Sequence, residues 1–143
     1  MRIGAVLIGA VMAVFAVTSA SATVRISGDL GGQIGHYLDR YAAVRNSGDR
    51  VVIDGSCVSA CTLVLGVVPS DRICVTSRAR LGFHAAWRPA GKAGQVTDDG
   101  GTQLLLQNYP QAVRSWIAQQ GGLTPKMIYL SGRELAAMYQ PCK

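Results

Sequence analysis

Two residues of this 143-residue chain have the types and the spacing of a catalytic pair. Ser59 follows the β-rich run of residues 51–54 and a glycine, and it precedes an apolar run that predicts a buried helix over residues 60–66. A hydroxyl at such a strand-to-helix turn lies beside backbone N–H groups that have no partner within the helix. It could attack a carbonyl carbon while a neighbouring N–H stabilises the oxyanion. His84 ends the next apolar run and could serve as the general base.

Each residue of this pair also has an ordinary structural interpretation. Serine is favoured as the N-cap of a helix whether or not it is reactive, and a histidine that ends an apolar run is commonly a core residue. The spacing between Ser59 and His84 favours the catalytic interpretation over these two. His36 lies on the polar side of its expected helix, and we interpret it as a surface residue. Lys126 is a less favoured candidate base, of the kind that serine–lysine peptidases use.

The first 22 residues have the composition of a signal peptide. Arg2 precedes a continuous apolar run over residues 4–17, and residues 20–22 have the small-x-small form of a signal-peptidase site. We therefore expect a signal peptide over residues 1–22, one mature domain over residues 23–143, and a periplasmic or secreted location.

Export changes the interpretation of the cysteines. In an oxidising compartment, an even set of four cysteines predicts disulfide bonds, and the set allows three pairings among which the sequence does not choose. Any bridge from a cysteine that flanks Ser59 would hold the turn that carries it. Zinc ligation by that flanking pair with His84 is a less favoured alternative, and we expect no metal and no other cofactor. The four residues are Cys57, Cys61, Cys74 and Cys142.

The charge pattern limits the classes of partner. The formal net charge is +6, but the basic residues are scattered and form no block of five like charges. Weak attraction to an anionic envelope surface is compatible with this pattern. Binding to nucleic acid is not expected, because the sequence does not support it and export contradicts it.

The rest of the pattern predicts the elements that must position the pair. A strand, a Gly-Gly turn, a helix and a second strand follow one another and indicate a right-handed βαβ unit with a parallel sheet. Pro110 should kink or split its helix, and Ser131 with Glu134 forms a capping-box pattern. We expect strands over residues 24–28, 50–54, 72–76 and 79–83, helices over residues 33–46, 102–120 and 131–139, and a mobile surface loop over residues 87–101.

In three segments the chain resembles the ClpP/crotonase superfamily, specifically the small exported ClpP-like proteins of bacteria. These segments are Gly31-Gly32 between a strand and a helix, residues 55–61 around the serine, and residues 77–84 that end at the histidine. Residues 129–131 are similar to a Phe-Leu-Ser segment of the family. The resemblance implies a single α/β domain with a spiral of ββα units, one main parallel sheet and helices outside it.

The resemblance also implies roles for individual residues. Ser59 would be the nucleophile, His84 its general base, and the N–H groups of Gly32 and Ala60 the oxyanion hole. In the proteases of the family an aspartate orients the histidine, whereas this chain has Met127 at that position. Because a thioether accepts only weak hydrogen bonds, the pair would be a Ser-His dyad with no clear third acid.

The leading functional prediction is therefore a periplasmic serine hydrolase, most plausibly a peptidase that acts on a peptide or protein substrate. The alternative, which Met127 motivates, is a catalytically inactive ClpP-like envelope protein that acts as a binding or assembly module. Acyl-CoA chemistry of the crotonase kind is disfavoured, because CoA is cytoplasmic. We expect no ATPase partner, and for a homo-oligomer the apolar side of residues 102–120 would be the first candidate interface.

Overall fold

The structure, a computed structural model, describes residues 21–143. Apart from its last two residues, the signal peptide expected over residues 1–22 lies outside the described residues. Within the described range, no helix is both long enough and apolar enough to cross a membrane.

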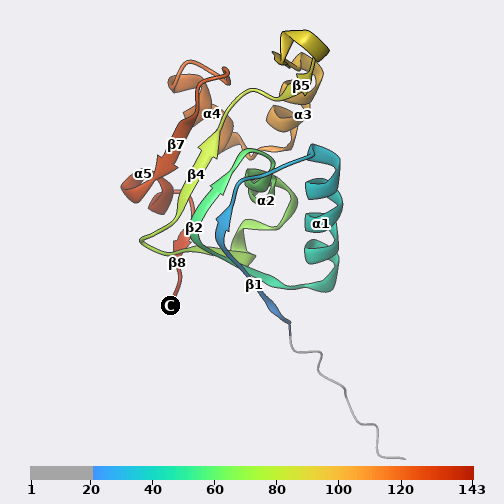
Figure 1. Cartoon of the computed structure of the whole chain (residues 1–143). Coiled ribbons are helices and arrows are strands. Elements are labelled where there is room, and N and C mark those ends of the chain that lie inside the picture. Colours follow the sequence, from blue (N-terminus) through green and yellow to red (C-terminus); the bar gives the residue numbers. More distant parts are fainter. Residues whose placement is uncertain (1–20) are drawn as a thin grey trace, which may run out of the picture.

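Strands and helices alternate through the first half of the chain, and a helical segment precedes the last two strands (Figure 1). In chain order the elements are β1 (Thr23–Asp29), α1 (Ile34–Ser47), β2 (Arg50–Val58), η1 (Ser59–Leu63), α2 (Val64–Val67), η2 (Ser70–Arg72), β3 (Ile73–Val75), β4 (Arg80–Phe83), β5 (Trp87–Pro89), η3 (Gly91–Ala93), β6 (Gln95–Thr97), α3 (Asp99–Asn108), α4 (Gln111–Gln119), β7 (Ile128–Ser131), α5 (Gly132–Ala136) and β8 (Gln140–Pro141), where η denotes a 3-10 helix.

β2 is the centre of the main sheet. β1 pairs with one edge of β2. Along the other edge, the first half of β2 pairs with β3 and the second half pairs with β4. All three pairings are parallel. β8 extends the sheet in parallel beyond β3, and β7 extends it beyond β4 in the antiparallel direction. The α/β class of a single domain is thus confirmed, but the sheet is mixed rather than purely parallel.

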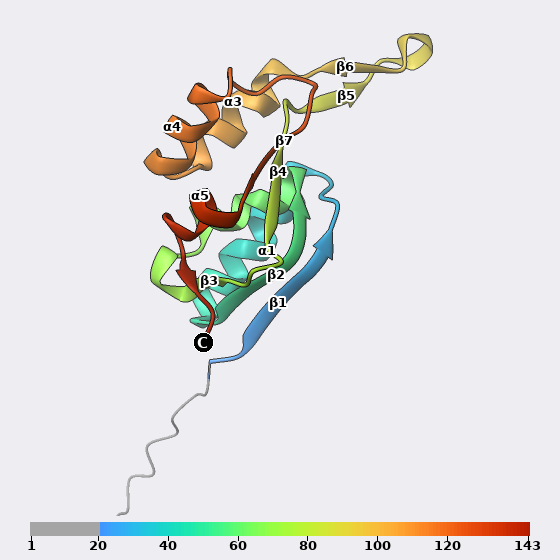
Figure 2. The same cartoon turned by 90° about the vertical axis from the view of Figure 1, so that its left-hand side faces the viewer.

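A β-bulge separates the two halves of β2. The register with β1 shifts between Ile26 and Gly28, so that Asp54 and Gly55 of β2 together oppose Ser27. A Cβ atom at Gly55 would lie 2.1 Å from the carbonyl oxygen of Ser27, so only glycine allows this approach. The bulge gives β2 the bend that is visible in Figure 2, and the bend lets one strand serve two different neighbours.

The bulge also places a carboxylate among hydrogen-bond donors. Asp54 is only 7% exposed and accepts hydrogen bonds from Thr76 at 2.7 Å, Arg78 at 2.6 Å and Arg25 at 2.7 Å. The hydrogen bonds from Thr76 and Arg78 lower the pKa of Asp54 to about 2, although burial of the carboxylate acts in the opposite direction. This cluster ties β1, β2 and the segment between β3 and β4 together.

The helical segment around Pro110 divides as the sequence predicts, because α3 ends at Asn108 and α4 begins at Gln111. Most of the apolar side that we expected as an interface between copies belongs to the core. Phe83 of β4 packs against Tyr109 and Trp116, with ring centroids at 5.3 and 5.7 Å. These contacts hold α3 and α4 beside the end of β4, where His84 follows.

Three expectations about local structure are wrong. Residues 87–101 contain the antiparallel hairpin β5–β6 instead of an irregular loop, and residues 60–66 begin as a 3-10 helix instead of a regular helix. The capping box does not form, because the side chain of Ser131 caps nothing and its backbone is paired with Arg80 in the sheet. In the third case, pairing with a distant segment decided the conformation.

The cysteines form two disulfide bonds, Cys57–Cys61 and Cys74–Cys142. The first closes around Ser59, and the second joins β3 to the residue after β8. Since all four sulfur atoms are paired, the alternative of zinc ligation by the flanking cysteines and His84 is wrong.

Removal of the Cys74–Cys142 bridge should cost about 4 kcal/mol of unfolding free energy, because a sequence separation of 68 restricts the unfolded chain strongly. The Cys57–Cys61 bridge, with a separation of 4, should contribute about 2 kcal/mol by the same chain-entropy relation. Guanidinium unfolding of the two double alanine variants measures both losses. Equal losses in the two variants would contradict this assignment.

Acid should weaken the fold through Asp54. Its folded-state pKa lies below the value of about 3.9 for an unfolded aspartate, so the unfolded chain binds the proton more readily. The stabilisation is complete above pH 4 and is lost as the pH falls through about 2. Asp54→Asn should lower stability at pH 7 and flatten the pH dependence between pH 4 and 2 in urea unfolding. Asp39→Asn, at an exposed acid of α1, is the matched control and should keep the wild-type slope.

Candidate active site

The turn at Ser59 carries backbone strain. β2 ends at Val58 and η1 begins at Ser59, which is the strand-to-helix turn that the sequence predicts. Ser59 has φ 57°, the single positive φ of a non-glycine residue within residues 21–143. Such a conformation is costly for serine and persists only where the surrounding structure enforces it.

Two sets of contacts enforce this turn. The Cys57–Cys61 bridge spans it, with 5.4 Å between the Cα atoms. The hydroxyl of Thr62 donates to the carbonyl oxygen of Ser59 at 2.7 Å and lies 2.6 Å from the hydroxyl of Tyr109. Because Thr62 is fully buried, the turn is anchored to the core while the side chain of Ser59 stays half-buried at the edge of a cavity.

Gly31 packs directly against the Ser59 turn. A Cβ atom at Gly31 would lie 2.5 Å from the carbonyl oxygen of Val58, 2.7 Å from Cβ of Ser59 and 2.9 Å from the backbone nitrogen of Ala60. Gly31 also has φ 80°, so two independent reasons require glycine there. At the neighbouring Gly32, a Cβ atom would meet only the ring of Tyr37, at 3.5 Å.

Asp29 holds the loop between β1 and α1 in this position. Its carboxylate accepts hydrogen bonds from the backbone N–H of Gly31 at 2.9 Å, from the hydroxyl of Tyr37 at 2.5 Å and from Arg40 at 3.2 Å. Partial burial raises the pKa of Asp29, but the hydrogen bonds from Tyr37 and Gly31 and the charge of Arg40 outweigh it, so the pKa is lowered. Sequence reasoning missed Asp29, although Asp-x-Gly before a helix is a recognisable turn signal.

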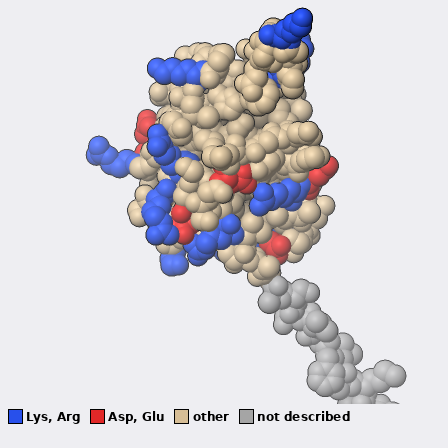
Figure 3. Space-filling model, in the orientation of Figure 1, with Lys and Arg blue, Asp and Glu red and all other residues tan. Residues whose placement is uncertain are grey.

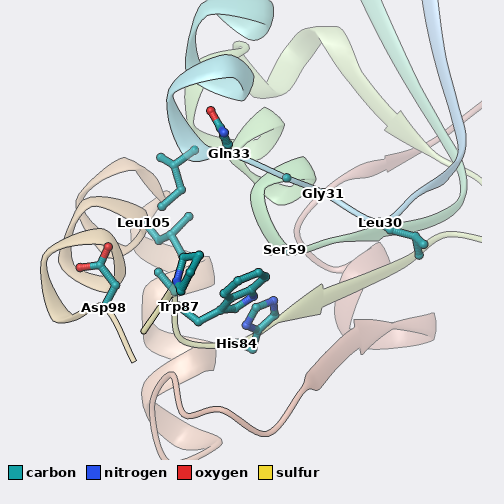
Figure 4. A pocket seen from close by; sticks show the side chains of 12 residues that line it. Leu30, Gly31, Gln33, Ser59, His84, Trp87, Asp98 and Leu105 are labelled. Atoms are coloured by element: carbon teal, nitrogen blue, oxygen red, sulfur yellow. The ribbon is translucent and has the colours of Figure 1, made fainter. Parts of the chain in front are cut away.

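Ser59, His84 and Gly32 line one cavity of about 570 Å³ (Figure 4). Apolar side chains, including Trp87 of β5 and Leu105 of α3, form much of its wall. The cavity is therefore a concave site in which three segments distant in sequence meet, with few polar side chains among apolar ones.

His84 is half-buried and follows the last residue of β4. Its Nδ1 lies 2.7 Å from the carbonyl oxygen of Ala85. In the tautomer with the proton on Nδ1, this nitrogen donates to Ala85 and Nε2 is left as an acceptor. Within residues 21–143 no hydrogen bond joins His84 to Ser59, although both residues line the cavity.

No carboxylate accepts a hydrogen bond from His84 in the described part of the chain. Asp98 lines the cavity, but it accepts from the N–H of Gly101 at 3.1 Å as the N-cap of α3, and Figure 4 shows it turned away from His84. The β4–β7 pairing ends at Phe83 opposite Ile128, and Met127 precedes this pair, with its sulfur atom 2.9 Å from the position that a Cβ atom at Gly82 would take. Met127 is not among the residues that line the cavity.

The two amides expected to form an oxyanion hole differ in their position relative to the cavity. The N–H of Gly32, which lines the cavity, has no backbone acceptor within residues 21–143. Ala60 is in the first turn of η1, where an N–H has no partner within the helix, and it lies next to Gly31, but it is buried and is not among the residues that line the cavity. A hydroxyl, an imidazole acceptor and the amide of Gly32 around one cavity can support acyl transfer to the hydroxyl.

The remaining candidates lie elsewhere. Lys126 is exposed and is not among the residues that line the cavity. His36 is exposed on α1, as expected for a surface residue. In the described range, no three or more side chains of histidine, cysteine, aspartate or glutamate gather in a way that could hold a metal ion.

Comparison with known proteins gives a limited result. No family model matches the chain, and no curated protein matches it. Among solved structures, the chain is similar to the ClpP1 N165D mutant from Listeria monocytogenes, with 15% identity and a TM-score of 0.46 over 83% of this chain and 71% of that one. A likeness at this level says nothing about activity, substrate or assembly, so functional inference rests on the residues of the cavity.

Proposed function

We propose that this chain is a ClpP-like serine hydrolase, of peptidase type, that uses Ser59 and His84 as a catalytic dyad. The main support is the shared cavity, which is lined by a strained serine, by an imidazole acceptor and by Gly32, whose N–H has no backbone acceptor within residues 21–143. Strain of this kind on a non-glycine residue is concentrated at functional sites in proteins.

The proposed reaction begins when the carbonyl carbon of an acyl substrate enters the cavity. Ser59 Oγ attacks this carbon, Nε2 of His84 accepts the hydroxyl proton, and the N–H groups of Gly32 and Ala60 stabilise the oxyanion. The imidazolium then donates the proton to the leaving group, and water releases the acyl group by the reverse sequence. Ser59 and His84 would have to approach each other when substrate binds, which is common for catalytic hydrogen bonds.

The carbonyl oxygen of Ala85 takes the role that an aspartate has in a catalytic triad. It holds His84 in the tautomer with the proton on Nδ1. A neutral carbonyl stabilises the imidazolium less than a carboxylate does, so the dyad should turn over slowly.

We also propose that the protein works in the periplasm or outside the cell. The signal-like segment over residues 1–22 and the two disulfide bonds support an oxidising compartment. Peptides or unfolded protein segments are the proposed substrates, because an extended chain can present a carbonyl to a cavity with apolar walls.

The second candidate is an inactive envelope protein that keeps the scaffold for binding or assembly. Met127, which stands where the resemblance implies an acid, and the absence of a Ser59–His84 hydrogen bond within residues 21–143 favour it. The two candidates differ in the reactivity of one hydroxyl, which can be measured directly.

A fluorophosphonate probe should label the wild-type protein at Ser59, as shown by mass spectrometry of the modified peptide. Ser59→Ala should abolish labelling, and His84→Ala should slow it by about 10²-fold or more, since general-base catalysis contributes at least that much. Ser115→Ala, at an exposed serine of α4, is the matched control and should label at the wild-type rate. A wild-type protein that stays unlabelled at high probe concentration would favour the inactive candidate.

Met127→Asp should increase the labelling rate about tenfold or more, because a carboxylate at the position where the resemblance implies an acid would accept the proton on Nδ1 of His84 and stabilise the imidazolium. Met127→Asn has nearly the same shape without the charge and should give a much smaller increase. Equal rates in the Asp and Asn variants would argue against His84 as the general base.

A further inference from the structure

A second cleft, of about 580 Å³, lies on the open face of the sheet. In the described part of the chain, α1 and α2 lie on one side of β1 and β2, and no helix covers the other side (Figure 2). The register places Arg25, Val52, Cys74 and Gln140 opposite one another in a row across β1, β2, β3 and β8. With about 4.8 Å between strands, this row spans about 14 Å.

The lining of this cleft is basic. It contains Arg25, Arg50 and Lys143, and it contains no acidic residue. Within residues 21–143, neither Arg50 nor Lys143 takes part in an ion pair. Figure 3 shows Lys and Arg side chains gathered over the lower part of the sheet, in the region of these strands.

The carboxylate of Asp54 positions part of this charge without cancelling it. Asp54 pairs with both Arg25 and Arg78, so one negative charge is shared by two guanidinium groups. Asp54 is 7% exposed, whereas the side chains of Arg25 and Arg78 are 57% and 73% exposed. The carboxylate therefore lies beneath the surface, and the solvent and any ligand meet the cations.

The polar side chains of the cleft are suited to a ligand that only accepts hydrogen bonds. Arg25, Arg50 and Lys143 are donors, and the amide of Gln140 can also donate, whereas the proton of the Thr76 hydroxyl is already donated to Asp54. Guanidinium groups bind phosphate oxygens in a bidentate geometry. Because the basic side chains reach the cleft from β1, β2 and the segment after β8, a single phosphate would leave part of this charge unused.

We propose that this cleft binds a ligand that carries two or more phosphate groups, either free in solution or displayed as a lipid headgroup. The site does not depend on the proposed hydrolase activity, since it shares no lining residue with the Ser59 cavity. The Cys74–Cys142 bridge and the hydrogen bond from Cys142 N–H to the carbonyl oxygen of Val75 at 3.0 Å fix the β8 wall of the cleft.

Calorimetric titration of the full chain with sodium tripolyphosphate tests the proposal at low and at physiological ionic strength. We expect saturable binding that Arg50→Gln weakens about tenfold or more, since a charge-assisted bidentate contact is lost. Arg50 is the residue to change because it has no ion pair within residues 21–143 whose loss would disturb the fold. Arg88→Gln removes the same charge from β5, outside the cleft, and should bind as the wild type does.

Vesicles distinguish the two sources of phosphate. Phosphatidylcholine vesicles with and without cardiolipin, a lipid with two phosphates, are compared by co-sedimentation with the same three proteins. Tripolyphosphate binding alone indicates a free ligand, and cardiolipin binding that Arg50→Gln reduces indicates a headgroup. The proposal is overturned if wild type binds neither probe, if Arg88→Gln reduces binding as much as Arg50→Gln, or if a short oligoglutamate competes as well as tripolyphosphate.

Discussion

The bend of β2 at Asp54 and Gly55 is the constraint on which both sites depend. Gly55 has no Cβ because the carbonyl oxygen of Ser27 occupies that space, and the resulting bulge divides β2 into two halves. The first half pairs with β3 and forms the floor of the basic cleft. The second half pairs with β4 and leads to Ser59, with His84 at the end of its neighbour.

Two carboxylates position the segments around β2: Asp29 at the end of β1 and Asp54 at the bulge of β2. Asp29 binds the N–H of Gly31 and so holds the glycine loop against the Ser59 turn. Asp54 binds Arg25 and Arg78 and so presents two cations beside the open face of the sheet. In both cases several donors converge on one carboxylate, which lowers its pKa and makes the arrangement sensitive to acid.

The candidate active site depends on strain that other contacts maintain. Ser59 keeps a positive φ because a disulfide spans its turn, Thr62 anchors its carbonyl, and Gly31 leaves space only for this path of the chain. The histidine lacks such support, since its Nδ1 contacts only a backbone carbonyl. The nucleophile is therefore positioned more firmly than the base, which is consistent with either a slow hydrolase or a site that has lost activity.

The sequence by itself determined the features that local patterns encode. These are the strand-to-helix turn at Ser59, the glycine loop before α1 and the division of the helical segment at Pro110. The sequence also indicated that all four cysteines form disulfide bonds, but not which cysteine pairs with which. Only the tertiary structure decided the β5–β6 hairpin, the antiparallel β7, the partner of each cysteine, and Gly31 rather than Gly32 as the glycine in contact with Ser59. The basic cleft also escaped the sequence, because its cations are scattered along the chain and meet only through the register of four strands. The reason is that periodicity and turn residues act over a few positions, whereas strand register and side-chain contact depend on segments that are far apart in the chain.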